Sequence, residues 1–272
     1  MIKKMSVLLG VLFLGFLFYL ASFFFFPQIR TLKKENPGKT AFMEYREKEW
    51  RETGKPLRIR QNWIPLGRIS PYLVKAVIIA EDDKFWSHEG FDFEAIRKAI
   101  EKDLKAKKFK WGASTISQQL AKNLYLTPSK NPVRKLKEAI LTWRIEQALP
   151  KKRIIEIYLN VVEWGEGIFG AEAAARHYYG KNAAALGPEE AARLAVVLPN
   201  PLRWNPAGNS RTVLNRSQII QNIMIRRGII IPVYEEVMKS EEDSEKPFSP
   251  GSQETLPENG WQGVPPAMKE VN

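Results

Sequence analysis

Residues 70–92, SPYLVKAVIIAEDDKFWSHEGFD, place an apolar helix directly before an acidic and aromatic turn. Ser70 is a suitable N-cap, and Pro71 is a favoured first residue of a helix. The apolar run over residues 73–79 supplies the side chains that such a helix buries. The pattern therefore predicts a helix over residues 71–83 that ends in side chains suited to chemistry.

Glu81 and Asp82 fall in the last predicted turn, where a negative charge opposes the helix dipole. Burial against Phe85 and Trp86 would add a desolvation cost, so both effects raise the pKa expected for Glu81. A carboxylate with a raised pKa can accept a proton near neutral pH. The same segment also fits a solvated acidic helix end, and taken alone it leaves both interpretations open.

Residues 7–26 contain no charge and are almost entirely apolar, and a helix needs about 20 such residues to cross a bilayer. A cleaved signal peptide is disfavoured because residues 22–27, SFFFFP, contain no small-x-small cleavage site. We therefore expect an uncleaved membrane anchor over residues 1–27. Basic residues stand on both sides of the span, so the positive-inside rule does not decide its orientation. The absence of cysteine fits an extracytoplasmic domain.

The remaining chain divides into a connector, a helical domain and a tail. Residues 28–60 are polar and charged, which is typical of a juxtamembrane connector. Residues 61–232 show helical patterns and little strand-like alternation apart from Ile229 to Ile231, so the domain is expected to be mainly α. The expected helices cover residues 71–83, 93–107, 115–124, 132–149, 152–161, 170–179, 188–197 and 211–226. Residues 233–272 are rich in Ser, Glu, Pro and Gly and are expected to be disordered.

The formal net charge of +12 is concentrated in one segment. Residues 97–137 hold twelve lysine and arginine residues and only two acidic residues. Such a block suits nucleic acid, anionic lipid headgroups or a phosphorylated substrate. The predicted membrane anchor favours the last two. No zinc-finger, RNA-recognition or basic-zipper pattern occurs, so nucleic acid is not an expected partner.

Three further motifs place polar and charged residues at helix starts. Residues 112–123, GASTISQQLAKN, suit either phosphate binding at a helix start or an ordinary Ser/Thr cap. Arg134 and Glu138 in RKLKE share one helix face. If that face is solvated, they form a weak surface ion pair. If it lines a cleft, Arg134 is a phosphate ligand and Glu138 is a second working carboxylate. The basic run at 151–153 leads into a stripe that includes Tyr158, for which core packing is the better interpretation.

Taken in order, these motifs resemble the glycosyltransferase domain of the peptidoglycan polymerases, glycosyltransferase family 51. The resemblance covers residues 64–228. It rests on ED-x-x-F-x-x-H-x-G-x-D from Glu81, GASTI-x-QQL-x-KN from Gly112 and RK-x-x-E from Arg134. K-x-x-IIE-x-YLN from Lys151, GI-x-G from Gly167, LPNP from Leu198 and WNP from Trp204 complete the order.

The resemblance implies a lysozyme-like helical fold that polymerises lipid II into β-1,4 glycan strands, with inversion and loss of undecaprenyl pyrophosphate. In that family the first glutamate, here Glu81, is the general base. The second, here Glu138, assists at the pyrophosphate, directly or through a divalent ion such as magnesium or manganese. No organic cofactor is implied.

The resemblance also assigns binding and structural residues. Those that match diphosphate or sugar contacts are Ser114, Thr115, Gln119, Lys122, Lys130, Arg134 and Lys135. Lys130 stands where many relatives have an arginine, and a lysine keeps the charge but loses the bidentate fork. Asp82, Phe85 and His88 are expected to organise the turn that follows Glu81.

Two other functions compete with this one. A lytic transglycosylase or lysozyme-like hydrolase has a related fold and paired carboxylates, but its neutral glycan has no use for the basic residues at 122–135. A non-catalytic membrane-anchored scaffold that binds anionic lipid would leave the ordered motifs unexplained. The sequence contains neither Ser-x-x-Lys nor Lys-Thr-Gly, so no transpeptidase activity is expected.

The expected partners and location follow from the resemblance. The partners are lipid II, the growing glycan strand and the bilayer, with penicillin-binding transpeptidases and divisome or elongasome proteins supplying cross-linking. The expected location is the bacterial plasma (inner) membrane, with a single span and the catalytic domain on the extracytoplasmic (periplasmic) side. Exposed Phe and Leu side chains are expected beside the cleft, where they would admit the lipid tail.

Overall fold

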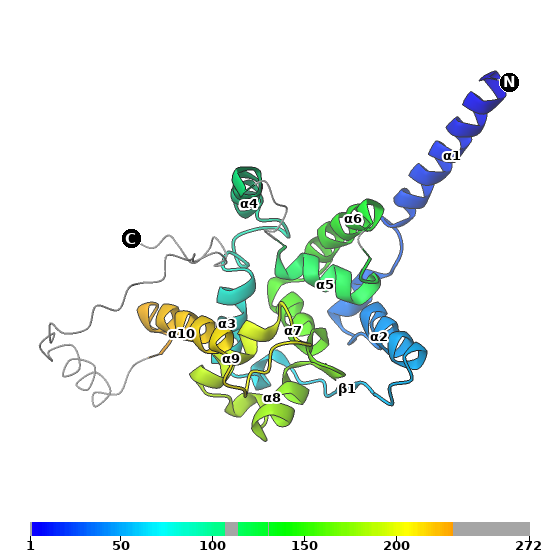
Figure 1. Ribbon diagram of the computed structural model, residues 1–272. Coiled ribbons are helices and arrows are strands. Elements are labelled where there is room, and N and C mark those ends of the chain that lie inside the picture. The colour runs from blue at the N-terminus through cyan, green and yellow to red at the C-terminus, as the bar shows by residue number, and fades with distance from the viewer. Residues whose placement is uncertain (1, 107–113, 130, 231–272) are drawn as a thin grey trace, which may run out of the picture.

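The computed structural model describes residues 2–106, 114–129 and 131–230, which form a mainly helical body with one small sheet (Figure 1). The α-helices are α1 (Ile2–Ser22), α2 (Ala41–Glu52), α3 (Pro71–Glu81), α4 (Phe93–Ala106), α5 (Ile116–Tyr125), α6 (Pro132–Ala148), α7 (Lys151–Val161), α8 (Ala171–Tyr179), α9 (Pro188–Val197) and α10 (Arg211–Arg226). The 3-10 helices are η1 (Ile29–Lys33), η2 (Leu66–Arg68) and η3 (Ala183–Ala185), and the strands are β1 (Arg60–Gln61), β2 (Glu163–Gly165) and β3 (Ile168–Phe169).

All the predicted helices form, and each boundary lies within two residues of the prediction. The mainly α fold class is therefore confirmed. The isoleucines at 229 and 230, which looked strand-like, form no strand. The predicted disordered tail at 233–272 lies outside the described residues.

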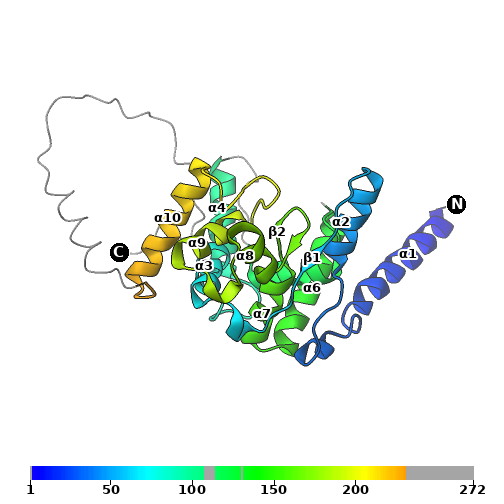
Figure 2. The same ribbon diagram turned by 90° about the horizontal axis from the view of Figure 1, so that it is seen from below.

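Helix α3 lies where the opening stretch predicted it and forms part of the core. Pro71 begins the helix, but the hydroxyl of Ser70 donates to the carbonyl of Leu186 at 2.7 Å and makes no capping bond. The apolar run at 73–79 packs against α9, and α10 packs against both helices (Figure 2). This packing fixes the position of Glu81, the last residue of α3.

Helices α5, α6 and α7 form a second packed group, because α5 contacts both of the others. Thr115 caps α5 in a capping box with Gln118, and the side chain of Asn131 caps α6. Most of α5 is buried, so the two polar side chains that it leaves half-buried, Gln119 and Lys122, are held by a rigid element.

The segment 28–60, expected as a connector, contains a helix that the sequence pattern did not predict. Helix α2 packs against α5 and buries Met43 and Trp50 in the main core. With only these two residues fully buried, α2 gives too weak an amphipathic signal to be recognised in sequence. At the end of the segment, β1 pairs in parallel with β3, which pairs antiparallel with β2.

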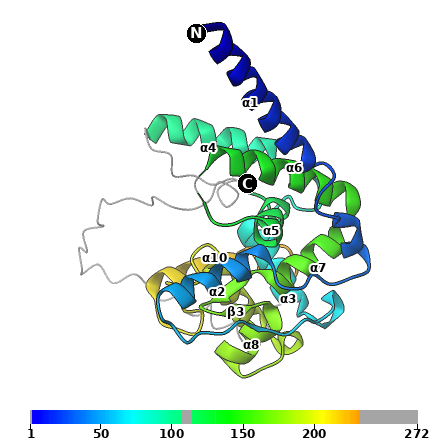
Figure 3. The same cartoon turned by 90° about the vertical axis from the view of Figure 1, so that its right-hand side faces the viewer.

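Helices α1, α4 and α6 mark one side of the molecule. Helix α1 projects away from the body, and α4 and α6 lie at the end from which it leaves (Figures 1 and 3). The stretch Lys4–Ser22 is long and apolar enough to cross a membrane, and none of it is buried. The large apolar residues exposed on α4 and α6 are Phe93, Ile100, Leu104, Leu136 and Trp143. These exposed side chains include one phenylalanine and two leucines, and that such residues lie beside the cleft stays a prediction.

Candidate active site

Glu81 is hydrogen-bonded to helix α5 in the middle of the fold. The side-chain amide of Gln119 donates to Oε2 of Glu81 at 2.7 Å. The amide oxygen of Gln119 in turn accepts from the hydroxyl of Tyr158 at 2.9 Å. Since Tyr158 is fully buried on α7, this chain of hydrogen bonds fixes the amide in the orientation that donates to Glu81.

The protein raises the pKa of Glu81, as the sequence predicted. Burial is the largest cause, and the charge of Asp82 adds to it. The hydrogen bond from Gln119 and the positive charges of Arg216 and Lys122 act in the opposite direction. Glu81 is therefore a carboxylate with a raised pKa whose charged form still has nearby support, which suits a general base.

The turn after Glu81 is tied to the start of α5 by Asp82. One oxygen of this buried carboxylate accepts from the backbone N–H of Ile116 at 2.9 Å, and the other lies 2.8 Å from Nε2 of His88. The N–H of Gly90 donates to Nδ1 of His88, so in the neutral ring Nε2 carries the proton and donates to Asp82. Phe85 is fully buried. The structure thus places Asp82, Phe85 and His88 as supports of the turn.

Glu138 lies in a cluster of cations at the start of α6. It is buried, and its Oε2 accepts from Arg134 at 2.6 Å while Lys135 binds its Oε1. Lys122 faces the same cluster, because the charges of Glu138, Arg134 and Lys135 all act on its ammonium group. Burial lowers the pKa of Lys122. The charge of Glu81 also acts on Lys122, so this ammonium is within electrostatic range of both carboxylates.

The structure describes two of the three remaining residues predicted to contact the substrate, Thr115 and Ser114. Thr115 is buried, and its hydroxyl already donates to the carbonyl of Gly90 at 2.7 Å and accepts from the N–H of Gln118. Ser114 is exposed at the helix start. Lys130 lies outside the described residues, as do Gly112 and Ala113 of the second motif.

The residues around Glu138 do not fit a preformed metal site. Both carboxylate oxygens are already bonded to cations, Arg134 and Lys135. No group of three or more His, Cys, Asp or Glu that could hold a metal occurs within the described residues. Magnesium is usually bound by one or two carboxylates together with waters and substrate phosphates, and here the one carboxylate, Glu138, is already paired with two cations. No catalytic step is assigned to a metal.

Two residues at this site were not assigned to it from the sequence. Tyr158 was expected only to pack in the core; a buried tyrosine hydroxyl needs a partner, but the sequence does not identify that partner as Gln119. Arg216 on α10 acts electrostatically on Glu81, and its guanidinium lies 5.4 Å from the ring centroid of Trp204. Val213 and Ser217, which flank Arg216 on α10, are buried, so Arg216 lies at the edge of the core-facing side of this helix. This position on the helix is the one feature that could have drawn attention to Arg216.

Comparisons with known proteins identify the family of this chain. The sequence profile of the Transglycosylase family matches residues 48–225, which is more than half of the chain. The chain is 55% identical over 185 residues to a biosynthetic peptidoglycan transglycosylase of Dechloromonas aromatica (strain RCB). The aligned region covers 68% of this chain and 80% of that protein.

Two further relatives share that name. The one from Nitrosospira multiformis is 48% identical over 219 residues, covering 79% of this chain and 95% of the relative. The one from Laribacter hongkongensis is 47% identical over 215 residues, covering 79% and 94%. A match across the whole segment that carries Glu81, α5 and α6, at identities near one half, shows that this chain belongs to the transglycosylase family, glycosyltransferase family 51.

Proposed function

We propose that this chain polymerises lipid II, with Glu81 as the general base and Lys122, Arg134 and Lys135 as the cations that bind the diphosphate of the donor. Membership of the family makes the chain a peptidoglycan glycosyltransferase. One observation carries the assignment of residues. Gln119 and Lys122 lie three residues apart on α5 and so share a face; one binds Glu81, and the other interacts with both Glu81 and Glu138.

The proposed step is a displacement at C1 of the donor sugar. The 4-hydroxyl oxygen of the acceptor attacks C1, and its proton passes to the carboxylate of Glu81. The bond between C1 and the diphosphate oxygen breaks as the new glycosidic bond forms, so the anomeric centre inverts. The bonding electrons leave with the undecaprenyl diphosphate. Glu81 must be ionised at the start of the step, and the hydrogen bond from Gln119 favours that state.

The cation cluster has a role that a hydrolase of neutral glycan would not require. Negative charge develops on the diphosphate as the bond breaks, and preorganised cations stabilise such charge strongly in a partly desolvated site. Lys122 is suited to this role because no hydrogen bond or ion pair occupies its ammonium group in the part of the chain that is described. In this proposal Glu138 acts through Arg134 and Lys135, holding both cations at the start of α6.

The proposed lipid-linked substrate is consistent with the proposed location of the protein at a membrane. A lipid-linked donor requires a catalytic domain close to a bilayer, and the apolar stretch Lys4–Ser22 fits a membrane anchor. The exposed apolar residues on α4 and α6 lie at the same end of the molecule and would accompany the lipid tail. We place the protein in the plasma (inner) membrane, with the catalytic domain on the extracytoplasmic (periplasmic) side, where transpeptidases and divisome or elongasome proteins would cross-link its product.

The decisive experiment is incubation of the purified full-length protein with lipid II. Glycan polymer free of anhydro ends is the expected product; anhydro-ended fragments from added peptidoglycan would indicate lysis, and no reaction with either substrate would indicate a scaffold. Parallel reactions with magnesium, manganese or a chelator test whether a divalent ion assists at Glu138. The Glu81→Gln variant shows whether any polymer formed depends on the proposed base.

A further inference from the structure

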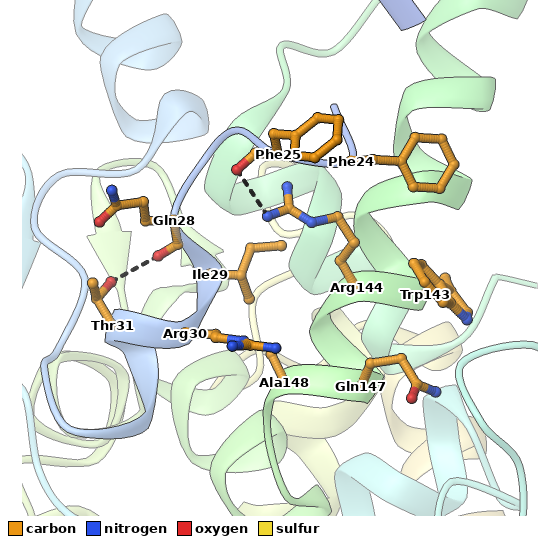
Figure 4. Close-up of a pocket in the computed structure, with 10 residues that line it drawn as sticks. All are labelled: Phe24, Phe25, Gln28, Ile29, Arg30, Thr31, Trp143, Arg144, Gln147 and Ala148. Carbon is orange, nitrogen blue, oxygen red and sulfur yellow. Dashed lines mark hydrogen bonds between the residues drawn. The ribbon is translucent and has the colours of Figure 1, made fainter. Parts of the chain in front are cut away.

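A cavity lies outside the active site, between the juxtamembrane segment 23–31 and helix α6. It has a volume of about 520 Å³. Phe24, Phe25 and Arg30 line it from the juxtamembrane segment, and Trp143 and Arg144 line it from α6 (Figure 4). The candidate membrane span ends at Ser22, so this juxtamembrane pocket opens where the chain leaves the span.

The juxtamembrane pocket contains two guanidinium groups that no carboxylate of the described residues neutralises. Arg144 donates to the backbone carbonyls of Phe23 at 2.8 Å, Phe25 at 3.2 Å and Pro27 at 2.8 Å. A guanidinium has five N–H donors, so these bonds leave two donors unused. Arg30 is exposed, and among the described residues neither arginine forms an ion pair. Burial lowers the pKa of Arg144, which nevertheless stays charged at any physiological pH.

The rim of the juxtamembrane pocket is aromatic and exposed. Phe24 is 49% exposed, Phe25 73% and Trp143 48%. Phe24 and Trp143 pack edge to face, with ring centroids 6.0 Å apart. Aromatic side chains of this kind gather where a membrane protein passes from the hydrocarbon into the headgroup region. The pocket therefore combines a cationic floor with an apolar rim at the end of a membrane span.

The juxtamembrane pocket is separate from the proposed diphosphate site. Arg144 follows Arg134 by ten residues on α6, and a rise of 1.5 Å per residue puts the two backbone positions about 15 Å apart along the helix. Lys122, Glu138 and the acidic turn are not among the residues that line it. Its occupant is therefore not expected to be the reacting diphosphate.

We propose that the juxtamembrane pocket binds the headgroup of an anionic phospholipid of the surrounding bilayer. The lipid phosphate takes the unused donors of Arg144 and the guanidinium of Arg30, as arginine favours phosphate oxygens. The acyl chains lie along Phe24, Phe25 and Trp143 toward the hydrocarbon. A headgroup with net negative charge is selected because two positive charges meet it without a neutralising carboxylate.

The test measures lipid binding by the purified full-length protein in a neutral detergent. Native mass spectrometry follows titration with short-chain phosphatidylglycerol, short-chain phosphatidylcholine or inorganic phosphate. We expect one tightly bound phosphatidylglycerol and at least about tenfold weaker binding of phosphatidylcholine. Arg30→Gln should weaken phosphatidylglycerol binding about tenfold or more, since it removes a charge-assisted contact with the phosphate.

Lys34→Gln is the matched control. Lys34 is exposed, lies four residues from Arg30 and does not line the pocket, so the variant removes the same charge from the same segment. It should bind phosphatidylglycerol like the unchanged protein. Arg30→Gln is preferred to Arg144→Gln as the main variant, because Arg144 also holds the juxtamembrane backbone.

Four results would overturn the proposal. The first is equal binding of the two phospholipids, and the second is an equal loss of phosphatidylglycerol binding in Arg30→Gln and Lys34→Gln. The third is binding of inorganic phosphate as tight as that of phosphatidylglycerol. The fourth is displacement of phosphatidylglycerol by stoichiometric lipid II. The third would show a site for free phosphate, and the fourth would assign the pocket to the substrate path. Tight binding of phosphatidylglycerol that only Arg30→Gln weakens, and that lipid II does not displace, would support it.

Discussion

The amide nitrogen of Gln119 lies 2.7 Å from Oε2 of Glu81, so a side chain on α5 binds the carboxylate that ends α3. Other parts of the fold hold both partners in place. The packing of α3 on α9 positions Glu81, and a hydrogen bond from the hydroxyl of Tyr158 orients Gln119. The hydrogen bond therefore acts on a carboxylate that cannot easily turn away. Its main chemical effect is to favour the ionised state of Glu81 against the cost of burial.

Replacement of the proposed base should abolish synthesis without unfolding the protein. Glu81→Gln keeps the size of the side chain but cannot accept the proton, and general bases contribute about 10²–10⁴ in rate. Polymer formation from lipid II should fall by that factor, as measured by gel analysis of the glycan. Glu89→Gln makes the same change at an exposed position of the same turn and should remain active. Comparable activity in the two variants would refute the assignment.

The pH dependence of the reaction should report the hydrogen bond to Glu81. Gln119 stabilises the charged form of the carboxylate, so Gln119→Leu raises the pKa of Glu81 further. The base is active when ionised, and the acid limb of the kcat/KM profile should move to higher pH. A hydrogen bond to a charged group contributes about 1.5–3 kcal/mol, which corresponds to a shift of about 1–2 pH units.

Tyr158→Phe is the companion variant for this profile. It leaves the N–H of Gln119 free to bind Glu81 and removes only the bond that orients the amide. Its acid limb should move less than that of Gln119→Leu. A merely structural role for Gln119 would instead lower activity equally at every pH, with no movement of the limb.

Loss of the charge at Lys122 should weaken binding of the diphosphate. Lys122→Glu places a negative charge beside Glu81 and Glu138, and affinity for undecaprenyl diphosphate should fall at least about tenfold, because charge-assisted contacts to phosphate are among the strong ones. Lys75→Glu gives the same change in net charge at an exposed position on α3 and should bind normally. Isothermal titration calorimetry distinguishes the two, and unchanged affinity in Lys122→Glu would count against the cluster.

Sequence patterns predicted those parts of the fold in which one helix face is strongly apolar. The run at 73–79 predicted α3 and so the position of Glu81, and the Ser/Thr capping signal in residues 112–123 marked the start of α5. Helix α2 was missed because its few buried residues are diluted by charged ones. Its burial depends on α5, a contact between distant segments that no local pattern contains.

The same reasoning explains which site residues could be found. Motif order located Glu81, Lys122 and Glu138, because each belongs to a short segment with a recognisable pattern. The hydrogen bond of Tyr158 to Gln119 and the electrostatic effect of Arg216 on Glu81 depend on α7 and α10 folding back toward α5 and α3. Sequence alone contains the hydroxyl and the guanidinium but not their partners.

Stability should depend on Asp82 more than on its neighbour Asp83. Asp82→Ala leaves the N–H of Ile116 and Nε2 of His88 without their acceptor, and a buried unsatisfied donor costs about 1–3 kcal/mol. Asp83→Ala removes a partly exposed ion pair with Arg227, which contributes under about 1 kcal/mol. Urea unfolding should therefore show a clearly larger loss for Asp82→Ala. Asp82→Asn, which keeps an oxygen able to accept from Ile116, should lie between them; equal losses in all three would show that Asp82 does not organise the turn.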